Sequence, residues 1–469
     1  MSGADVVEAL RSLLGPERVR TDAEALDACA RDTWPLRLVQ AAVGDAPLVR
    51  PLCVVSPRST AEVSSLLARL HELGAPVVPR GGGSGVGGGA EPGRHDAVVV
   101  DLAELRGLVE FDADNLLVTA RAGTPFRELT ALVEDAGFVL GHYPQSIELA
   151  QLGGLVATRS AGQFSTRYGG IEELVLEVEA VLQDGSVVRA GGIPRRAAGP
   201  DLRQLWIGSE GSLGIVTEVT LRLFRAPAAH RLAAYALPSF AAGLDAVRDV
   251  VQAGWRPAVV RLYDELETAR GFGEVAADGE AVLLTLAEGA DALVAAEAAA
   301  LEAALEGARP LGAVPVAAWL ERRNDVSDFH RFVASGVLVD TIDVAARWTR
   351  VRPVYDAVRA ALLAEIPELL VASAHASHVY PQGTNLYFIV AAEPPRDPVE
   401  VERVYRSIWD AAMRATLAAG GTIAHHHGIG KLRAPWLAAE LGSSYELLAR
   451  VKAALDPDGR MSPGTLLPG

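Results

Sequence analysis

Short apolar runs alternate with glycines and helical segments in the first half of the chain, from about residue 52 to residue 223. Runs rich in Val, Ile and Leu between turn residues are typical of β-strands. Residues 60–74 instead carry apolar side chains at helical spacing and end at a glycine, which predicts a helix. The strands predicted in this half are 52–57, 75–80, 97–102, 116–123, 174–191 and 214–224, the fifth of them folded into a hairpin at 184–185.

The pattern changes after Pro227, where alternating runs surround longer helical stretches. Alternation at 231–237 and 259–266 predicts strands, whereas the spacing in 287–307 and 398–417 predicts helices. The chain has 469 residues, about three times the length of an average domain, so two or three structural units are expected. We therefore expect one domain at 1–225, a second at 226–420, and a C-terminal segment at 421–469 that returns to the first.

Composition narrows the function classes. The chain has 43 Lys and Arg against 59 Asp and Glu, a net charge of −16. Such an acidic protein is a poor partner for nucleic acid or anionic membranes, so an anionic substrate must be held by a local positive cluster. The two cysteines, Cys29 and Cys53, form no disulfide framework. The N-terminus has no secretory signal and no run is long enough to span a membrane, so we expect a cytoplasmic protein, with a homodimer as one option.

A glycine-rich run, residues 77–89, is the most informative local feature. Glycines adopt positive φ and carry no side chain, so successive backbone N–H groups can converge on a phosphate. No Lys follows the run, which excludes a P-loop, and a strand rather than a helix comes next, which excludes a Rossmann fingerprint. A flexible surface loop is the alternative. Two further stretches of small residues, 142–175 and 206–221, favour a site for a long dinucleotide.

Three consecutive histidines, His425 to His427, stand in a run that we predict to be extended. In a strand His425 and His427 would share one face and His426 the other. A metal site is one alternative, but no carboxylates accompany the histidines at ligand spacing, so we expect no bound metal. Structural histidines are a further alternative, and acid–base chemistry or anion binding is favoured because imidazole titrates near neutral pH. Arg261 lies in a predicted strand, where a salt bridge to Asp264 or Glu265 is the alternative to a site role.

Four motifs in order resemble the FAD-linked oxidases of the vanillyl-alcohol-oxidase type. They are PRGGGSG, LGGLVATRSAG with YGGIEELV, GPDLRQLWIGSEGSLGIVTEVTL and HHHGIGKLR. The bacterial relatives of alkyldihydroxyacetonephosphate synthase are the most similar subgroup, and glycolate and D-lactate dehydrogenases are broader cousins. The resemblance implies an α+β fold, with a two-subdomain FAD-binding domain of the PCMH type (core about 46–227) and a cap domain of an antiparallel sheet with flanking helices.

The resemblance also implies which residues hold FAD. No His or Cys lies in 81–89, where many relatives attach the cofactor covalently, so non-covalent FAD is expected. The residues implied to contact it are Pro79, Arg80, Gly81, Gly82, Gly83, Ser84, Gly85, Gln145, Ser146, Gln151, Gly153, Gly154, Thr158, Ser160, Ala161, Glu210, Gly211, Gly214, Ile215 and Val216.

By the same resemblance Tyr380 is the acid–base residue, the triple-His run lies against the flavin, and Arg261 lies in the active site. A phenol needs a positive neighbourhood to act as a base at neutral pH, which the histidines could supply. Lys431 and Arg433 are candidates to hold a substrate carboxylate. The synthases carry an Arg–Asp pair for substrate phosphate where this chain has Phe329–His330, and Arg331 is the nearest cation.

Three functions follow, and the first is favoured. It is hydride transfer from a small hydroxy acid or alcohol to flavin N5, with an electron acceptor that the sequence does not name. The second is the synthase-like alkyl transfer through a flavin adduct without net redox. The third is a non-catalytic flavin-binding subunit.

Overall fold

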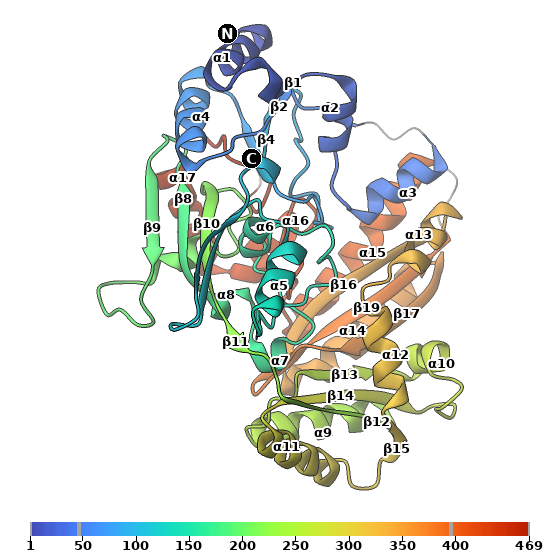
Figure 1. Ribbon diagram of the computed structural model, residues 1–469. Coiled ribbons are helices and arrows are strands. Elements are labelled where there is room, and N and C mark those ends of the chain that lie inside the picture. The colour runs from blue at the N-terminus through green and yellow to red at the C-terminus, as the bar shows by residue number, and fades with distance from the viewer. Residues whose placement is uncertain (1, 45–47, 394–396, 468–469) are drawn as a thin grey trace.

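The computed structural model describes residues 2–44, 48–393 and 397–467. It confirms the predicted α+β class, with sheets in both halves of the chain and helices packed against them (Figure 1). The first half forms the upper part of Figure 1, and the sheet of the second half lies below it. In the described ranges, no helix combines the length and apolarity needed to cross a membrane.

The first sheet is built on parallel strands. Its order is β1 (Val19–Arg20), β2 (Cys53–Val55), β4 (Val98–Asp101) and β3 (Val77–Arg80), with β1 antiparallel to the rest. Helix α4 (Thr60–Leu73) connects β2 to β3 and buries four apolar residues in the core shared with α1 (Gly3–Leu14). The glycine-rich run then leads from β3 to β4, so it joins strand to strand as predicted.

A second, antiparallel sheet of five strands completes this half. Its order is β5 (Leu108–Asp112), β6 (Leu117–Arg121), β10 (Ile215–Arg222), β8 (Val175–Val181) and β9 (Val187–Gly191). The hairpin between β8 and β9 turns at Asp184–Gly185, as predicted, with Gly185 at φ +85°. The helices and short strands of this half are α2 (Ala23–Cys29), α3 (Pro35–Val43), α5 (Phe126–Asp135), α6 (Leu152–Ala157), α7 (Ser165–Tyr168), α8 (Ile171–Leu174), β7 (Phe138–Val139) and β11 (Phe224–Arg225).

The cap is an eight-stranded sheet in which neighbouring strands pair antiparallel. Seven strands follow the order β15 (Arg309–Gly312), β12 (Ala229–Leu237), β14 (Ala281–Gly289), β13 (Val259–Tyr263), β17 (Leu369–Ala376), β19 (Gly383–Ala392) and β16 (Leu338–Arg347), and β18 (Val379–Tyr380) pairs with β19. Its helices are α9 (Phe240–Gln252), α10 (Glu265–Gly271), α11 (Asp291–Ala304), α12 (Val314–Arg322), α13 (Ser327–Ala334), α14 (Trp348–Glu365) and α15 (Pro398–Ala419).

Alternation along β19 separates the two faces of the cap sheet. Leu386, Phe388 and Val390 pack into the large core formed with α14 and α15. Tyr387 and Ile389 point the other way and line a cavity between the two halves. The sheet therefore presents its second face to the first half of the chain.

Two predicted boundaries in the cap are wrong. The strand predicted at 259–266 ends at Tyr263, because Asp264 accepts the Glu267 amide and caps α10. The helix predicted at 287–307 begins only at Asp291, because β14 precedes it. That strand is buried at every position except its last, so its sequence shows no alternation.

Segments from both ends of the chain cross between the halves. Helix α3 packs on α15, and Trp34 donates its indole N–H to the Tyr405 hydroxyl at 2.9 Å. After α16 (Ala434–Leu441) and α17 (Ser443–Leu455), the chain returns to the first sheet, where Met461 pairs with Val77.

Candidate active site

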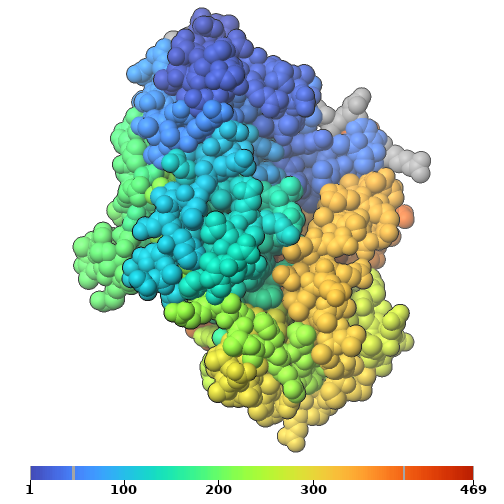
Figure 2. Space-filling view, viewed as in Figure 1, coloured from blue at the N-terminus to red at the C-terminus, as the bar shows by residue number. Residues whose placement is uncertain are grey.

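A cavity of about 710 Å³ lies between the two halves. It extends from the glycine-rich loop to the cap strands β13, β16, β17 and β19 and to the α12–α13 segment. Figure 2 shows the outer surface where yellow and orange residues of the cap meet cyan residues of the first half. The predicted cofactor residues that line the cavity are Pro79, Gly81–Gly85, Gln145, Ser146, Gln151, Gly153, Gly154, Thr158, Ser160, Ala161, Glu210, Gly211, Gly214, Ile215 and Val216.

Arg80 is the exception among the predicted cofactor residues. Its guanidinium turns to the N-terminal segment, where Nη1 donates to the Arg31 carbonyl at 2.9 Å. Arg80 thus supports the wall beside Asp32, which does line the cavity, rather than lining it itself.

The glycine-rich loop has the geometry of a backbone cradle. A Cβ on Gly82 would lie 1.6 Å from the Leu149 carbonyl oxygen, and Gly83 has φ +66°. A Cβ on Gly154, which lies next to Gly81 of the loop, would meet nothing within 4 Å. Gln151 Oε1 is buried here without a partner. An unpaired acceptor beside backbone that tolerates no side chain fits a cofactor with a diphosphate and polar edges.

Glu210 joins the cradle to the histidine run. Its carboxylate accepts the amides of Ile429 at 2.7 Å and Gly430 at 2.8 Å. Burial raises the pKa of Glu210, although these amides and two nearby cations favour the charged form. Glu210 therefore holds the loop that follows the histidines as well as lining the cavity.

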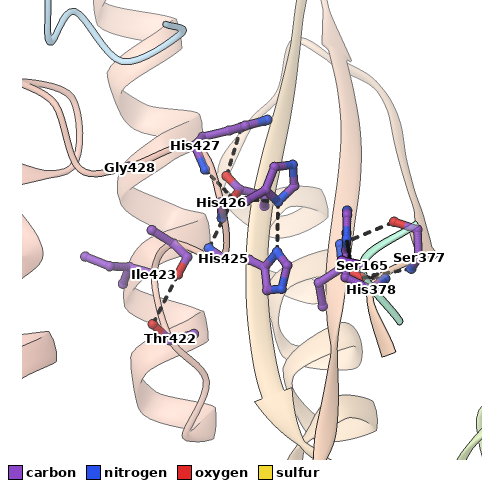
Figure 3. A network of polar contacts seen from close by, with 12 residues as sticks. Ser165, Ser377, His378, Thr422, Ile423, His425, His426, His427 and Gly428 are labelled. Atoms are coloured by element: carbon purple, nitrogen blue, oxygen red, sulfur yellow. Dashed lines mark hydrogen bonds and ion pairs between the residues drawn. The ribbon is translucent and has the colours of Figure 1, made fainter. Parts of the chain in front are cut away.

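The histidine run is not a strand, so the predicted alternation is wrong. The backbone N–H groups of all three histidines point at one oxygen, Asp343 Oδ2, at 3.1, 2.7 and 3.1 Å in chain order. In this stretch, among the described residues, Thr422 alone makes a bridge to a strand, at Ala345. Three consecutive amides on one acceptor form a tight loop, which Figure 3 shows beside the strands of the cap.

Asp343 is the centre of this arrangement. It is fully buried on β16, lies 3.0 Å from His427 Nδ1, and also binds the buried guanidinium of Arg433. Burial would raise the pKa of Asp343, but His427, Arg433 and His426 outweigh it and hold the pKa well below its ordinary value. Asp343 is therefore a permanent anion at neutral pH.

The imidazoles form a connected network. His425 and His426 place their Nδ1 atoms 2.8 Å apart, and the Tyr380 hydroxyl lies 2.8 Å from His425 Nε2. Behind them Ser165 lies 2.6 Å from His378 Nδ1. His426, His427 and His378 line the cavity, whereas Tyr380 and His425 stand one step away from it. His378, His425 and His426 each place a ring nitrogen within 4.8 Å of the others.

We expected the histidines to surround Tyr380 with positive charge, and this expectation is wrong. Burial lowers the pKa of His425 to about 4 and places that of His426 well below its ordinary value. These imidazoles are neutral at pH 7. Burial, with Glu172 and Glu173, also raises the pKa of Tyr380, so its phenol keeps its proton.

Arg261 lines the cavity and is held by neutral groups. Its Nε donates to the Tyr263 hydroxyl at 2.7 Å, and Nη2 lies 2.6 Å from His375 Nε2. His375 Nδ1 in turn lies 2.9 Å from Glu267, which fixes the tautomer that accepts from Arg261. The predicted alternative, an ion pair with Asp264 or Glu265, does not form within the described ranges. Arg261 thus brings positive charge to the cavity.

The other predicted substrate cations lie elsewhere. Lys431 donates to the carbonyls of Gly88 and Glu91, and Arg433 to Asp343 and two carbonyls, so neither is available to a substrate. Arg331 is exposed and pairs with Asp328. None of these three is among the described residues that line the cavity.

Sequence reasoning also missed residues that line the cavity or build it. Asp343 and Tyr387 stand in apolar strands, and an acid in such a run was a signal that could have been used. His375 and Arg323 gave no local signal, because only the fold brings β17 and α12 to the same cavity.

Comparison with known proteins agrees with the two-part site. The FAD binding domain family matches residues 51–191, and the C-terminal domain of FAD linked oxidases matches residues 226–466. The uncharacterized FAD-linked oxidoreductase YgcU of Escherichia coli K12 is 34% identical over all of this chain and 99% of its own length. Alkyldihydroxyacetonephosphate synthase of Caenorhabditis elegans is 28% identical over 89% of this chain and 76% of its own length.

Glycolate oxidase subunit GlcD of Bacillus subtilis is 27% identical over 89% of each chain. Among solved structures, an alkyldihydroxyacetonephosphate synthase has a similar fold, with a TM-score of 0.80, 22% identity, and coverage of 99% of this chain and 85% of its own. These matches confirm the predicted family and its cofactor, FAD. The chain belongs to the FAD-linked oxidases, with a PCMH-type FAD-binding domain followed by the C-terminal domain of that family.

Proposed function

We propose that this protein oxidises a small 2-hydroxy acid, with FAD held non-covalently between its two halves. The observation that carries the proposal is Arg261, a cavity arginine whose direct contacts, Tyr263 and His375, are neutral, with the Glu267 carboxylate one residue further away behind His375. Within the described residues Nη1 of Arg261 makes no hydrogen bond, and a guanidinium with an available Nη1 is suited to a carboxylate. Relatives named D-lactate dehydrogenase and glycolate oxidase subunit support this substrate class.

His427 is the group that we assign as general base. Its Nδ1 lies 3.0 Å from Asp343 Oδ1, although without hydrogen-bond geometry. We assign the proton to Nδ1 because the anion Asp343 is on that side, which leaves the lone pair of Nε2 for the substrate. The charge of Asp343 also stabilises the imidazolium formed when Nε2 takes the hydroxyl proton of the substrate. Arg261 holds the carboxylate, so that the hydroxyl carbon is oriented in the cavity.

The bound FAD supplies the hydride acceptor, and the protein supplies placement and proton transfer. Tyr380, His425 and His426 form a hydrogen-bonded chain that ends in the cavity. We assign this chain to proton relay rather than to direct abstraction, because Tyr380 stands behind the imidazoles and its pKa is raised by burial.

Anaerobic reduction of the purified holoprotein tests the proposal. 2-Hydroxy acids are expected to bleach the flavin absorbance near ~450 nm, whereas alcohols of the same length without a carboxylate should be slower by about a hundredfold or more. Arg261→Ala should remove this difference, and His427→Gln should slow reduction by both. Equal reduction by acids and alcohols, or none by any hydroxy acid, contradicts the proposal.

A second candidate function is the alkyl transfer of the synthases, which the named relatives and the apolar residues Trp319, Phe329 and Ile389 in the cavity favour. Phe329 itself stands where the synthases carry an arginine, and it removes a phosphate-binding cation. Formation of an ether lipid from an acyl glycerone phosphate and a fatty alcohol, without flavin bleaching by hydroxy acids, would establish this function instead.

A further inference from the structure

The α12–α13 segment forms one wall of the cavity and contains polar atoms without partners. Arg323 Nε and Asn324 Oδ1 are buried and unpaired. Opposite them Gln163, from the first half, donates through Nε2 to the Arg323 carbonyl at 3.3 Å and leaves Oε1 unpaired. All three residues line the cavity. Buried polar atoms are normally paired, so their convergence on one cavity wall indicates a polar ligand.

The guanidinium of Arg323 is held in place from behind. Its Cζ lies 5.8 Å from the ring centre of Tyr143 and 5.5 Å from that of Phe164, and Nη1 donates to the Leu320 carbonyl at 3.0 Å. Within the described residues no carboxylate lies within ion-pair distance of it. Burial lowers the pKa of Arg323, but arginine stays charged at neutral pH. The Glu134 carboxylate, which accepts from the Tyr143 hydroxyl, acts on the pKa from a distance, but within the described residues no ion pair neutralises the guanidinium.

Trp319 lies near Arg323 and also near Arg261, the residue that we propose to bind the substrate carboxylate. The Arg261 Cζ lies 5.6 Å from the ring centre of Trp319. Trp319 and Arg323 are four residues apart in helical backbone, so they lie on one face with about 6 Å between their Cβ atoms. Trp319 thus has Arg261 beside its ring and Arg323 one helical turn further along, so an elongated ligand lying along Trp319 would extend from one arginine towards the other.

We propose that Arg323, with Gln163 and Asn324, is a second anion subsite, and that the substrate carries a second carboxylate at the end far from Arg261. The inference rests on the proposed function, which it narrows from 2-hydroxy acids to dianionic ones. The acid on this segment, Asp325, is exposed and accepts the Ser327 amide, so it faces the helix end at the rim.

The test measures binding without turnover. Non-oxidisable dicarboxylates of increasing length, from succinate to adipate, and monocarboxylates of the same lengths are titrated into oxidised holoprotein while the flavin spectrum is followed. One dicarboxylate length is expected to bind about tenfold or more tightly than its monocarboxylate, and Arg323→Ala should abolish that preference. Arg323→Lys should restore part of it. Arg322→Ala, in the exposed neighbouring residue, is the control and should keep the wild-type preference.

Each outcome separates this inference from the proposed function. If dicarboxylates bind through Arg323 but no hydroxy acid reduces the flavin, the subsite stands and the redox proposal fails. If hydroxy acids reduce the flavin and a second carboxylate brings no advantage, or its advantage survives Arg323→Ala in protein with normal FAD content, the subsite is overturned.

Discussion

At the scale of single residues, Asp343 determines the form of the active site. A strand would have spread the three histidines over two faces. A single buried carboxylate instead collects their amides, orients the His427 ring and neutralises Arg433. One acid thus fixes the backbone, the tautomer and the charge of the cluster.

Replacing this acid should cost both stability and activity. Asp343→Asn leaves the fully buried Arg433 without its counter-ion, which is expected to lower the free energy of unfolding by about 3–5 kcal/mol. Urea denaturation and the rate of flavin reduction measure the two effects. Asp410→Asn, in an exposed pair with Arg414, is the matched control and should change stability far less. Equal effects of the two substitutions would contradict this role.

Asp32 makes stability depend on pH. Burial first, and then Glu91, raise the pKa of Asp32 from 3.8 to about 7. Between these values the folded state keeps a proton that the unfolded state has lost, so stability falls as pH rises from about 4 to 7 and is level above. Asp32→Asn should match the wild type at pH 4 and exceed it at pH 8 by roughly 3–4 kcal/mol.

Denaturation of the FAD-free protein at the two pH values measures this difference. The exposed Asp114→Asn serves as the control. A gain from Asp32→Asn that is the same at pH 4 and pH 8 would show that the carboxyl does not titrate in this range.

At the scale of elements, the strands and turns that a local sequence pattern determines could be predicted. The strands of the first half, the hairpin at 184–185 and the strand-to-strand glycine loop were all confirmed, because alternation and turn residues act over a few positions. Strand β14 was missed because burial on both faces removes alternation. The histidine run was misassigned because a carboxylate far along the chain, Asp343, sets its backbone.

The same distinction applies to the site. The glycine and small-residue stretches that line the cavity could be predicted, since their composition reflects close approach of a ligand. Apart from Arg261, the cations could not. Lys431, Arg433 and Arg331 are occupied or exposed, and Arg323, which sequence spacing did not single out, faces the cavity because α12 lies over it.

Helix α6 allows a test of the cofactor contact that is separate from folding. Gly154 lies in this helix and lines the cavity, and an added Cβ meets no protein atom within 4 Å. Gly154→Ala should therefore raise the stability of FAD-free protein by up to about 1 kcal/mol. It should at the same time weaken FAD binding by about tenfold or more, because the methyl group enters the cofactor's space.

Fluorescence titration with FAD and thermal unfolding of the apoprotein give the two values. Gly271→Ala, in α10, adds a methyl group that also meets nothing, and it should leave FAD affinity unchanged. Unaltered FAD binding in Gly154→Ala would place the cofactor elsewhere.

At the scale of the whole molecule, the two halves share structure rather than merely touch. We propose units at about 1–225, 226–420 and 421–469, but Trp34 and α3 from the first pack into the core of the second. Trp34 also lies under the glycine loop, where a Cβ on Gly88 would come within 2.7 Å of its ring. One indole thus supports the cofactor loop and the cap together.

Trp34→Ala should show this coupling. Removing a fully buried indole is expected to cost about 3–5 kcal/mol of stability and also to weaken FAD binding, because the loop loses its support. Leu244→Ala, in the part of the same core away from the loop, should cost stability but leave FAD affinity intact. Thermal unfolding and FAD titration of both variants provide the comparison, and loss of stability alone in Trp34→Ala would argue against coupling.

The crossing of both chain ends between the halves also limits how the cleft can move. Helix α3 is packed in the cap, and residues 456–462 are bound to the first sheet. A hinge motion that opened the two halves would therefore have to break buried contacts on both sides. Motion is then confined to small shear between packed layers. Helix α13 buries only Val333 of its own side chains, so the α12–α13 segment is the part of the cavity wall that can move without disturbing either anchor, and we expect ligands to exchange past it.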